Sequence, residues 1–164
     1  LPDNQNYKLV YTGVGKINAA IAATTCCLEP DCQLIINYGT AGALSNNIIN
    51  HLVSIGTIYQ RDMDARPLSE LGYTPFENDD GCIKINDSPY TLSTGDNFVK
   101  AIPEILTDAV DMEAYAIAKV CRRFNVPFEC YKYMTDLADE NAADHWQENV
   151  SNGIEKITDL LMRI

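Results

Sequence analysis

Short apolar runs and longer segments with helical spacing alternate along this chain of 164 residues. Runs of apolar and β-branched residues predict strands at 8–12, 33–37, 52–59, 82–85, 90–93 and 128–134. Apolar residues spaced three and four apart predict helices at 16–28, 97–106, 112–124 and 141–164. Polar and turn-forming residues predict an irregular loop at 61–81. Strands that alternate with helices are typical of α/β proteins with a largely parallel sheet.

The spacing within the first predicted helix indicates which of its sides faces the core. The segment is rich in Ala, and Ile17, Ala20, Ile21 and Thr24 share one face. We expect this face to be buried. The helix is expected to end before Pro30, because proline lacks the N–H that a continuing helix needs.

Three polar clusters follow predicted strands, which is where an α/β sheet binds its ligands. They lie at 13–16, 39–42 and 135–139. The first fits no dinucleotide fingerprint, since Asn18 stands where the third glycine would be. It predicts either a close backbone approach at a helix N-terminus, which suits an anion or a hydroxyl, or a packing turn only.

The acidic residues near these clusters have two interpretations. Asp136 and Asp139 follow an apolar strand, where partial desolvation raises a carboxyl pKa and suits a general acid. Alternatively, they cap the terminal helix. Asp111 and Glu113 stand at the start of a predicted helix, whose dipole favours acidic residues there. Their pattern alone therefore indicates helix stabilisation.

The charge balance argues against several classes of partner. Because 12 Lys and Arg face 23 Asp and Glu, the net charge is −11, which repels nucleic acid and anionic membrane surfaces. No apolar run reaches the roughly 18 residues that a membrane span needs. Six cysteines, with neither a secretion signal nor zinc-finger spacing, predict reduced thiols in the cytoplasm and no metal site.

Five segments, taken in chain order, resemble the motifs of the nucleoside phosphorylase/nucleosidase family. They are a first glycine motif at 13–20, a second at 37–44, a base-binding segment at 93–99, a Met-Glu motif at 110–118 and a Thr-Asp motif at 135–139. The ordered set is most similar to 5′-methylthioadenosine/S-adenosylhomocysteine nucleosidases. The resemblance implies a single domain over 1–164, with a three-layer α/β/α fold around a mixed, largely parallel twisted sheet.

This resemblance implies an enzyme that hydrolyses the N-glycosidic bond of a 5′-thio-substituted adenosine without a cofactor. Asp136 would share its proton with purine N7, which makes adenine a leaving group. Glu113 would hold the ribose hydroxyls and stabilise the positive charge that develops on the sugar. Thr40 would face the attacking water. Lys132 stands where these nucleosidases usually have Arg.

Five further positions match the family's substrate-binding residues. Phe98 would stack on adenine, and the backbone of Val99 would read the edge of the base. Met112 would pack under the sugar, and Gly42 and Asp111 would complete the site. Members of this type are usually homodimers, so the resemblance also implies a homodimer whose second subunit completes the pocket for the 5′ group.

Two other functions stay open. Phosphorylases of the same family typically have a phosphate-binding Arg where this chain has Asn37. Lys16, Arg61 and Arg66 are the cations left to bind phosphate, so hydrolysis is favoured. The second alternative is a nucleoside-binding protein without turnover. The family's N-terminal strand and its water-activating Glu have no match here, so we expect a domain without that strand, whereas the two acidic motif residues argue for catalysis.

Overall fold

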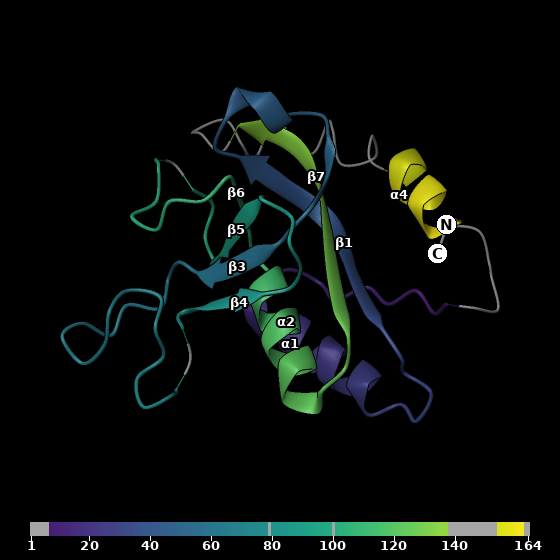
Figure 1. Ribbon diagram of the computed structural model, residues 1–164, viewed down its shortest axis with the longest axis horizontal. Helices are drawn as coiled ribbons and strands as arrows, with labels where there is room; N and C mark the ends of the chain where they lie inside the picture. The colour runs from purple at the N-terminus through teal and green to yellow at the C-terminus, as the bar shows by residue number, and fades with distance from the viewer. Residues whose placement is uncertain (1–6, 79, 100, 138–153, 163–164) are drawn as a thin grey trace.

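The computed structural model describes residues 7–78, 80–99, 101–137 and 154–162 of the chain. Its strands are β1 (Ile35–Ala43), β2 (Leu52–Ser54), β3 (Thr57–Gln60), β4 (Cys82–Lys84), β5 (Thr91–Thr94), β6 (Ala109–Asp111) and β7 (Phe128–Leu137). The helices of the described residues are α1 (Lys16–Cys27), the 3₁₀ helix η1 (Asn46–Ile48), α2 (Ala114–Phe124) and α4 (Ile154–Leu161). The predicted combination of strands and helices is confirmed (Figure 1).

The strands form one mixed sheet in the order β2-β7-β1-β6-β5-β3-β4. β1 runs parallel to β7, and β5 runs parallel to both β6 and β3. The pairings β2–β7, β1–β6 and β3–β4 are antiparallel. The expected α/β fold with a mixed sheet is therefore confirmed, and β1 with β7 is its longest parallel pair.

The predicted strand over 52–59 is divided into β2 and β3, which belong to different parts of the sheet. The division falls at Gly56, where the chain turns against the backbone of Ser88. A Cβ at Gly56 would lie 2.0 Å from the carbonyl oxygen of Ser88, so a larger residue could not make this turn. Because so short a connection joins β2 to β3, the sheet must curl (Figure 1).

Helices lie on both faces of the curled sheet (Figure 1). On one face, α2 packs through Ala114 and Ala118 on the buried side chains of the strands, and α1 packs on α2. On the other face, α4 lies beside β7, where Nζ of Lys156 is 5.2 Å from the centre of the Tyr133 ring. Side chains alternate along a strand, so Tyr133 and the core residue Met134 point to opposite faces of the sheet.

The buried face of α1 differs from the predicted one. Ala19 and Ala23 are buried against α2. Ile17 and Ile21, which the spacing places in the core, are 74% and 62% exposed. Small alanine side chains let two helices approach closely, and this leaves the larger isoleucines outside the contact. An apolar stripe of α1 therefore faces away from the other described residues.

Two predicted elements do not form in the described residues. Residues 8–12 are not a strand, because no strand described here pairs with them. The described part of 97–106 is not helical. The carbonyl of Asn97, which a helix would use, accepts a hydrogen bond from Arg61, and Pro103 has no N–H to donate. The sequence also gives no signal for β6, since three residues are too few to show a period.

The polar cluster at 39–42, which was predicted to follow a strand, lies within β1. β1 includes Gly39 and Gly42, and β7 continues beside it to Leu137. Their register shifts between Ala41 and Gly42, so that Gly42 pairs with Asp136. The additional strand length therefore brings the second glycine motif and the Thr-Asp motif side by side.

The last predicted helix is confirmed in part. α4 lies inside the predicted range and buries Ile157, one of its apolar residues. The other residues predicted to be helical between 141 and 153, together with Asp139, lie outside the described residues.

Candidate active site

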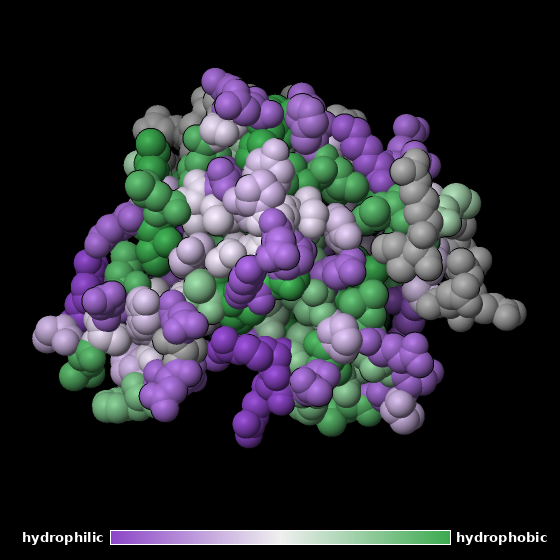
Figure 2. Space-filling view, viewed as in Figure 1, coloured by the Kyte–Doolittle hydropathy of each residue, from purple (hydrophilic) through white to green (hydrophobic). Residues whose placement is uncertain are grey.

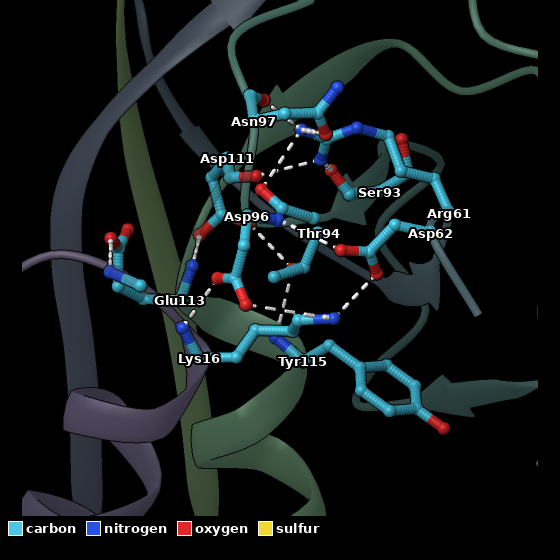
Figure 3. Close-up of polar contacts among 12 residues, drawn as sticks. Lys16, Arg61, Asp62, Ser93, Thr94, Asp96, Asn97, Asp111, Glu113 and Tyr115 are labelled. Carbon is cyan, nitrogen blue, oxygen red and sulfur yellow. Dashed lines mark hydrogen bonds and ion pairs between the residues drawn. The ribbon is translucent and has the colours of Figure 1, made fainter.

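The Met-Glu motif lies where β6 ends and α2 begins, next to the first turn of α1 (Figure 3). The N–H of Gly15 donates a hydrogen bond of 2.9 Å to Oε1 of Glu113. The N–H of Lys16 donates one of 2.8 Å to Oδ1 of Asp96. The close backbone approach predicted at this helix N-terminus is therefore present, and its partners are two carboxylates of the chain itself, which the helix dipole favours.

Gly15 must be a glycine for this contact to form. Its φ is 92°, in the left-handed region that side chains disfavour. A Cβ at this position would also lie 3.2 Å from Oδ1 of Asp96. The first glycine motif therefore allows the backbone to approach both carboxylates.

Glu113 is half-buried, and its surroundings set its charge. Burial raises the pKa of its carboxyl group, and the Gly15 N–H and the charge of Lys132 offset only part of this effect. A carboxylate that burial destabilises is stabilised when positive charge develops close to it. Glu113 can therefore favour a cationic transition state.

Lys132 and Asp111 form a buried ion pair within electrostatic reach of Glu113. Nζ of Lys132 lies 2.9 Å from Oδ2 of Asp111, and neither side chain is more than 1% exposed. Burial acts to lower the pKa of Lys132, but the negative charge of Asp111 opposes it, and the pKa is raised to about 12. Lys132 therefore keeps a positive charge at neutral pH.

Protein donors engage both carboxylate oxygens of Asp111. Oγ1 of Thr94 donates a hydrogen bond of 2.5 Å to Oδ1. The N–H groups of Glu113 and Ala114 donate to Oδ2 at 3.2 and 2.8 Å, as in the capping of a helix. Asp111 thereby joins β5, Lys132 and the first turn of α2, and it fixes the backbone that carries Glu113.

β1 and β7 carry the other residues predicted for the sugar side. Gly39 lies opposite Lys132, and a Cβ at Gly39 would lie 3.3 Å from Nζ, so glycine leaves room for the ammonium group. The backbone of Asp136 pairs with Gly42. Thr40 is half-buried, and alternation along β1 places its side chain on the face opposite Lys132. The structure therefore does not bring the Thr40 and Lys132 side chains together.

The predicted base-binding segment follows β5 and lies next to the first turn of α1. Asp96 accepts the N–H of Lys16, Phe98 is 52% exposed, and Val99 is buried. An exposed ring beside a fixed backbone suits stacking on a flat base. Met112 is half-buried between β6 and α2. The structure thus brings together the base-binding segment, the first glycine motif and the Met-Glu motif.

The cations considered for phosphate binding all have protein partners. Arg61 is 9% exposed and donates to backbone carbonyls. Lys16 forms an ion pair with Asp62, and Arg66 forms one with Asp64. Sequence reasoning missed the structural role of Arg61. Its position directly after β3 could have indicated that its side chain is buried, but not which carbonyl groups it binds.

Within the described ranges, no three His, Cys, Asp or Glu side chains come together in a way that could hold a metal ion. The helices described there are all too short or too polar to span a bilayer. Each of the six cysteines is a free thiol.

Known proteins with similar sequences belong to the family that the motifs resemble. A family model described as the Phosphorylase superfamily matches residues 67–164. The 5′-methylthioadenosine/S-adenosylhomocysteine nucleosidase of Staphylococcus haemolyticus is 34% identical over 85% of this chain and 72% of that protein. The nucleosidase of the same name from Staphylococcus carnosus is 30% identical over 99% of this chain and 82% of that protein.

Solved structures share the fold. Futalosine hydrolase of Helicobacter pylori has a TM-score of 0.84 and 22% identity, over 94% of this chain and 78% of that one. The 5′-methylthioadenosine/S-adenosylhomocysteine nucleosidase from Helicobacter pylori with butyl-thio-DADMe-Immucillin-A has a TM-score of 0.81 and 23% identity, with 94% and 78% covered. Fold and motifs together define a nucleoside phosphorylase-like α/β protein. The chain belongs to the Phosphorylase superfamily.

Proposed function

We propose that this protein is a purine nucleosidase, which hydrolyses 5′-methylthioadenosine, S-adenosylhomocysteine or a related adenosine to adenine and the thioribose. The observation that carries the proposal is the Glu113 carboxylate, held by the Gly15 N–H near the buried pair of Lys132 and Asp111. The Staphylococcus nucleosidases, similar over most of this chain, support the class of substrate.

The charges of the site fit this reaction. Cleavage of the glycosidic bond builds positive charge on the ribose, which Glu113 stabilises through the sugar hydroxyls. Asp136 protonates purine N7, so that adenine leaves as a neutral base. Lys132 supplies a fixed positive charge, and Asp111 acts by holding Lys132 and the backbone of Glu113. Met112 packs under the sugar.

The base lies against the segment after β5 in this proposal. Phe98 stacks on adenine, and the backbone of Val99 reads the edge of the base. Gly42, which pairs with Asp136, lets the substrate approach the backbone closely. Thr40 stays the predicted contact for the attacking water, although its side chain lies on the strand face opposite Lys132.

Hydrolysis is favoured over phosphorolysis because the candidate phosphate cations are already engaged. Arg61 is buried among carbonyl oxygens, and Lys16 and Arg66 bind carboxylates of the chain. A phosphate dianion needs several charge-assisted donors, often the paired N–H groups of Arg. Recruiting these cations for phosphate would break contacts that the fold already uses.

We further propose that the enzyme is a homodimer. Apolar residues are exposed along α1 and the segment before it, namely Leu9, Val10, Tyr11, Val14, Ile17 and Ile21. Hydrophobic residues also gather at the left margin of Figure 2, over the segment after β5, where the exposed ones are Phe98, Ile102 and Leu106. Exposed apolar patches mark protein–protein contacts. A second copy would cover such surface and complete the pocket for the 5′ group.

The cysteines support a location for this activity. All six are free thiols, which is typical of a reducing compartment. We therefore propose a cytoplasmic enzyme. The proposed substrates, and not the cysteines, indicate nucleoside catabolism and methionine salvage.

The test follows free adenine in mixtures of the protein with methylthioadenosine, adenosylhomocysteine or adenosine, each with and without phosphate. We expect adenine without phosphate, and the three rates rank the 5′ groups. Adenine that appears only with phosphate would establish phosphorolysis. No adenine in any mixture would indicate a binding protein without turnover.

The Asp136→Asn variant tests the proposed acid. Turnover should fall by about 10²–10⁴-fold, the range for loss of a general acid. The matched control is Asp87→Asn. Asp87 is an exposed carboxylate that forms an ion pair with Lys84. Near-normal turnover of Asp136→Asn would remove this residue from the mechanism.

A further inference from the structure

Arg61 directly follows β3, and its guanidinium group binds the base-binding segment. Nη1 donates hydrogen bonds of 2.8 Å to the carbonyl oxygens of Ser93 and Asp111. Nη2 donates to the carbonyl oxygens of Gly95 at 3.0 Å and Asn97 at 2.6 Å. The guanidinium group thus holds three alternate carbonyls of one extended segment and one carbonyl of β6 (Figure 3).

Asp62, the next residue, binds the same segment at a different point. Its Oδ2 accepts the N–H of Asp96 at 2.9 Å, and its Oδ1 accepts Nζ of Lys16 at 2.5 Å. The N–H of Lys16 in turn donates to Asp96. These contacts join the loop after β3, the base-binding segment and the first turn of α1 into one network (Figure 3).

The packing is tight where Arg61 meets Gly95. A Cβ at Gly95 would lie 2.9 Å from Cζ of Arg61 and 3.1 Å from its Nε. The guanidinium group cannot move away without breaking its carbonyl contacts. Arg61 and Gly95 therefore hold each other in place. This contact sets the direction of the backbone that continues from Gly95 to Phe98 and Val99.

Arginine suits this position for a geometric reason. Its planar group presents several N–H donors in fixed directions, so it can bind four carbonyl oxygens that themselves carry no charge. A lysine ammonium would keep the positive charge but could not reach the same spread of acceptors. The contacts of Arg61 thus define a backbone path and not an anion site.

We infer that Arg61 and Asp62 are positioning residues that set which purine base the protein accepts. The inference rests on the proposed function, since Phe98 and Val99 bind the base only there. Backbone groups that read a base edge must be placed accurately, since a misplacement of about 1 Å in an active site can lower the reaction rate on the order of 10²-fold. Arg61 and Asp62 act through the segment that carries these groups and do not touch the base.

The test compares adenine with hypoxanthine, two purines that differ at the edge that backbone groups read. Calorimetry gives the Kd of each base for the wild-type protein, Arg61→Lys and Gly95→Ala. Gly95→Ala keeps every charge but pushes the Arg61 guanidinium group out of place. The matched control is Arg123→Lys, at an exposed arginine in the last turn of α2.

We expect adenine to bind about 10–100-fold more weakly to Arg61→Lys and Gly95→Ala. The ratio of adenine to hypoxanthine affinity should fall by about tenfold or more in both. The control should keep wild-type values of both quantities. A purely structural role would lower the fraction of protein that binds, seen in the stoichiometry, and leave the affinity ratio unchanged, which would overturn the inference.

Asp62→Asn keeps the inference testable if the other variants fail to fold, because the Asp62 side chain is 28% exposed. It should lower the affinity ratio in the same direction, and an unchanged ratio would count against the inference. Adenine release by the wild-type protein tests the proposed function separately. Selective adenine binding without turnover would refute the nucleosidase but keep the inference, whereas adenine release without selective binding of adenine would overturn the inference and keep the nucleosidase.

Discussion

Two buried cations, Arg61 and Lys132, bind Asp111 through different atoms. Arg61 binds the backbone carbonyl of Asp111 together with three carbonyls of the base-binding segment. Lys132 binds its carboxylate. The acceptors of Arg61 carry no charge and fix directions, whereas the acceptor of Lys132 neutralises it. The base side of the candidate site is therefore organised by geometry and the sugar side by charge.

The ionisation of the two cations reflects this difference. Burial lowers the pKa of Arg61, and the acidic residues nearby offset only part of the effect. Burial also acts to lower the pKa of Lys132, but there Asp111 prevails and the pKa is raised to about 12. Removing the cation should therefore harm the sugar side mainly through the charge that is left behind.

The largest expected effect comes from Lys132→Met, which breaks the sugar side. Asp111 would be left buried without its counter-charge, and loss of one partner of a buried pair costs about 3–5 kcal/mol of folding free energy. Urea unfolding at pH 7 measures the loss. The double variant Lys132→Met with Asp111→Asn should recover part of it, because the buried charge is gone. Equal stability of the single and double variants would show that Lys132 acts by packing and not by charge.

A smaller effect of opposite sign is expected for Glu113→Gln. Because burial raises the pKa of Glu113, its carboxyl group takes up a proton more readily in the folded protein than in the unfolded chain. This contribution to stability is fully present below the unfolded pKa of about 4.3 and is lost as the pH rises through the folded pKa. Gln resembles the protonated form at every pH. The variant should therefore be more stable than the wild-type protein at pH 7.

Urea midpoints at two pH values check this prediction. The advantage of Glu113→Gln at pH 7 should disappear below about pH 4, where the wild-type carboxyl is protonated in both states. A variant that is less stable than the wild type at pH 7 would contradict the assigned cost of the buried carboxylate.

The smallest effect is expected at a pair outside both regions. Lys84 and Asp87 form an ion pair with side chains that are 69% and 96% exposed. Water and salt screen such pairs strongly. Lys84→Met should leave the urea midpoint within experimental error at low and high salt. A clearly lower urea midpoint at low salt would show that exposed ion pairs contribute measurably to the stability of this protein.

Much of the fold follows from patterns that are local in the sequence. α1, α2 and β7 stand out because each is long enough to show a period, and the five motifs identify the family because they occur in order. β6, with three residues, shows no period. The buried face of α1 was wrongly predicted. Spacing shows which side of a helix is apolar, but it does not show which side packs on α2. The contact with α2 is close and buries the small side chains of Ala19 and Ala23.

Some residues of the candidate site could be predicted from the sequence, and others could not. Glu113 could be predicted from its motif, and its contact with Gly15 agrees with a glycine turn at a helix N-terminus. The role of Arg61 could not, because its acceptors are backbone carbonyls more than 30 residues away, and every residue type has a carbonyl. Side-chain identity at Ser93 or Asn97 therefore gives no sign of the contact.

Steady-state kinetics of Arg61→Lys and Glu113→Gln, measured side by side on methylthioadenosine, test the central claim most directly. If geometry governs the base side, Arg61→Lys raises KM and leaves kcat within a few-fold. If charge governs the sugar side, Glu113→Gln lowers kcat by about 10²–10³-fold with little change in KM, because its contact strengthens as the sugar becomes cationic. Loss of the same parameter to the same extent in both variants would contradict the account.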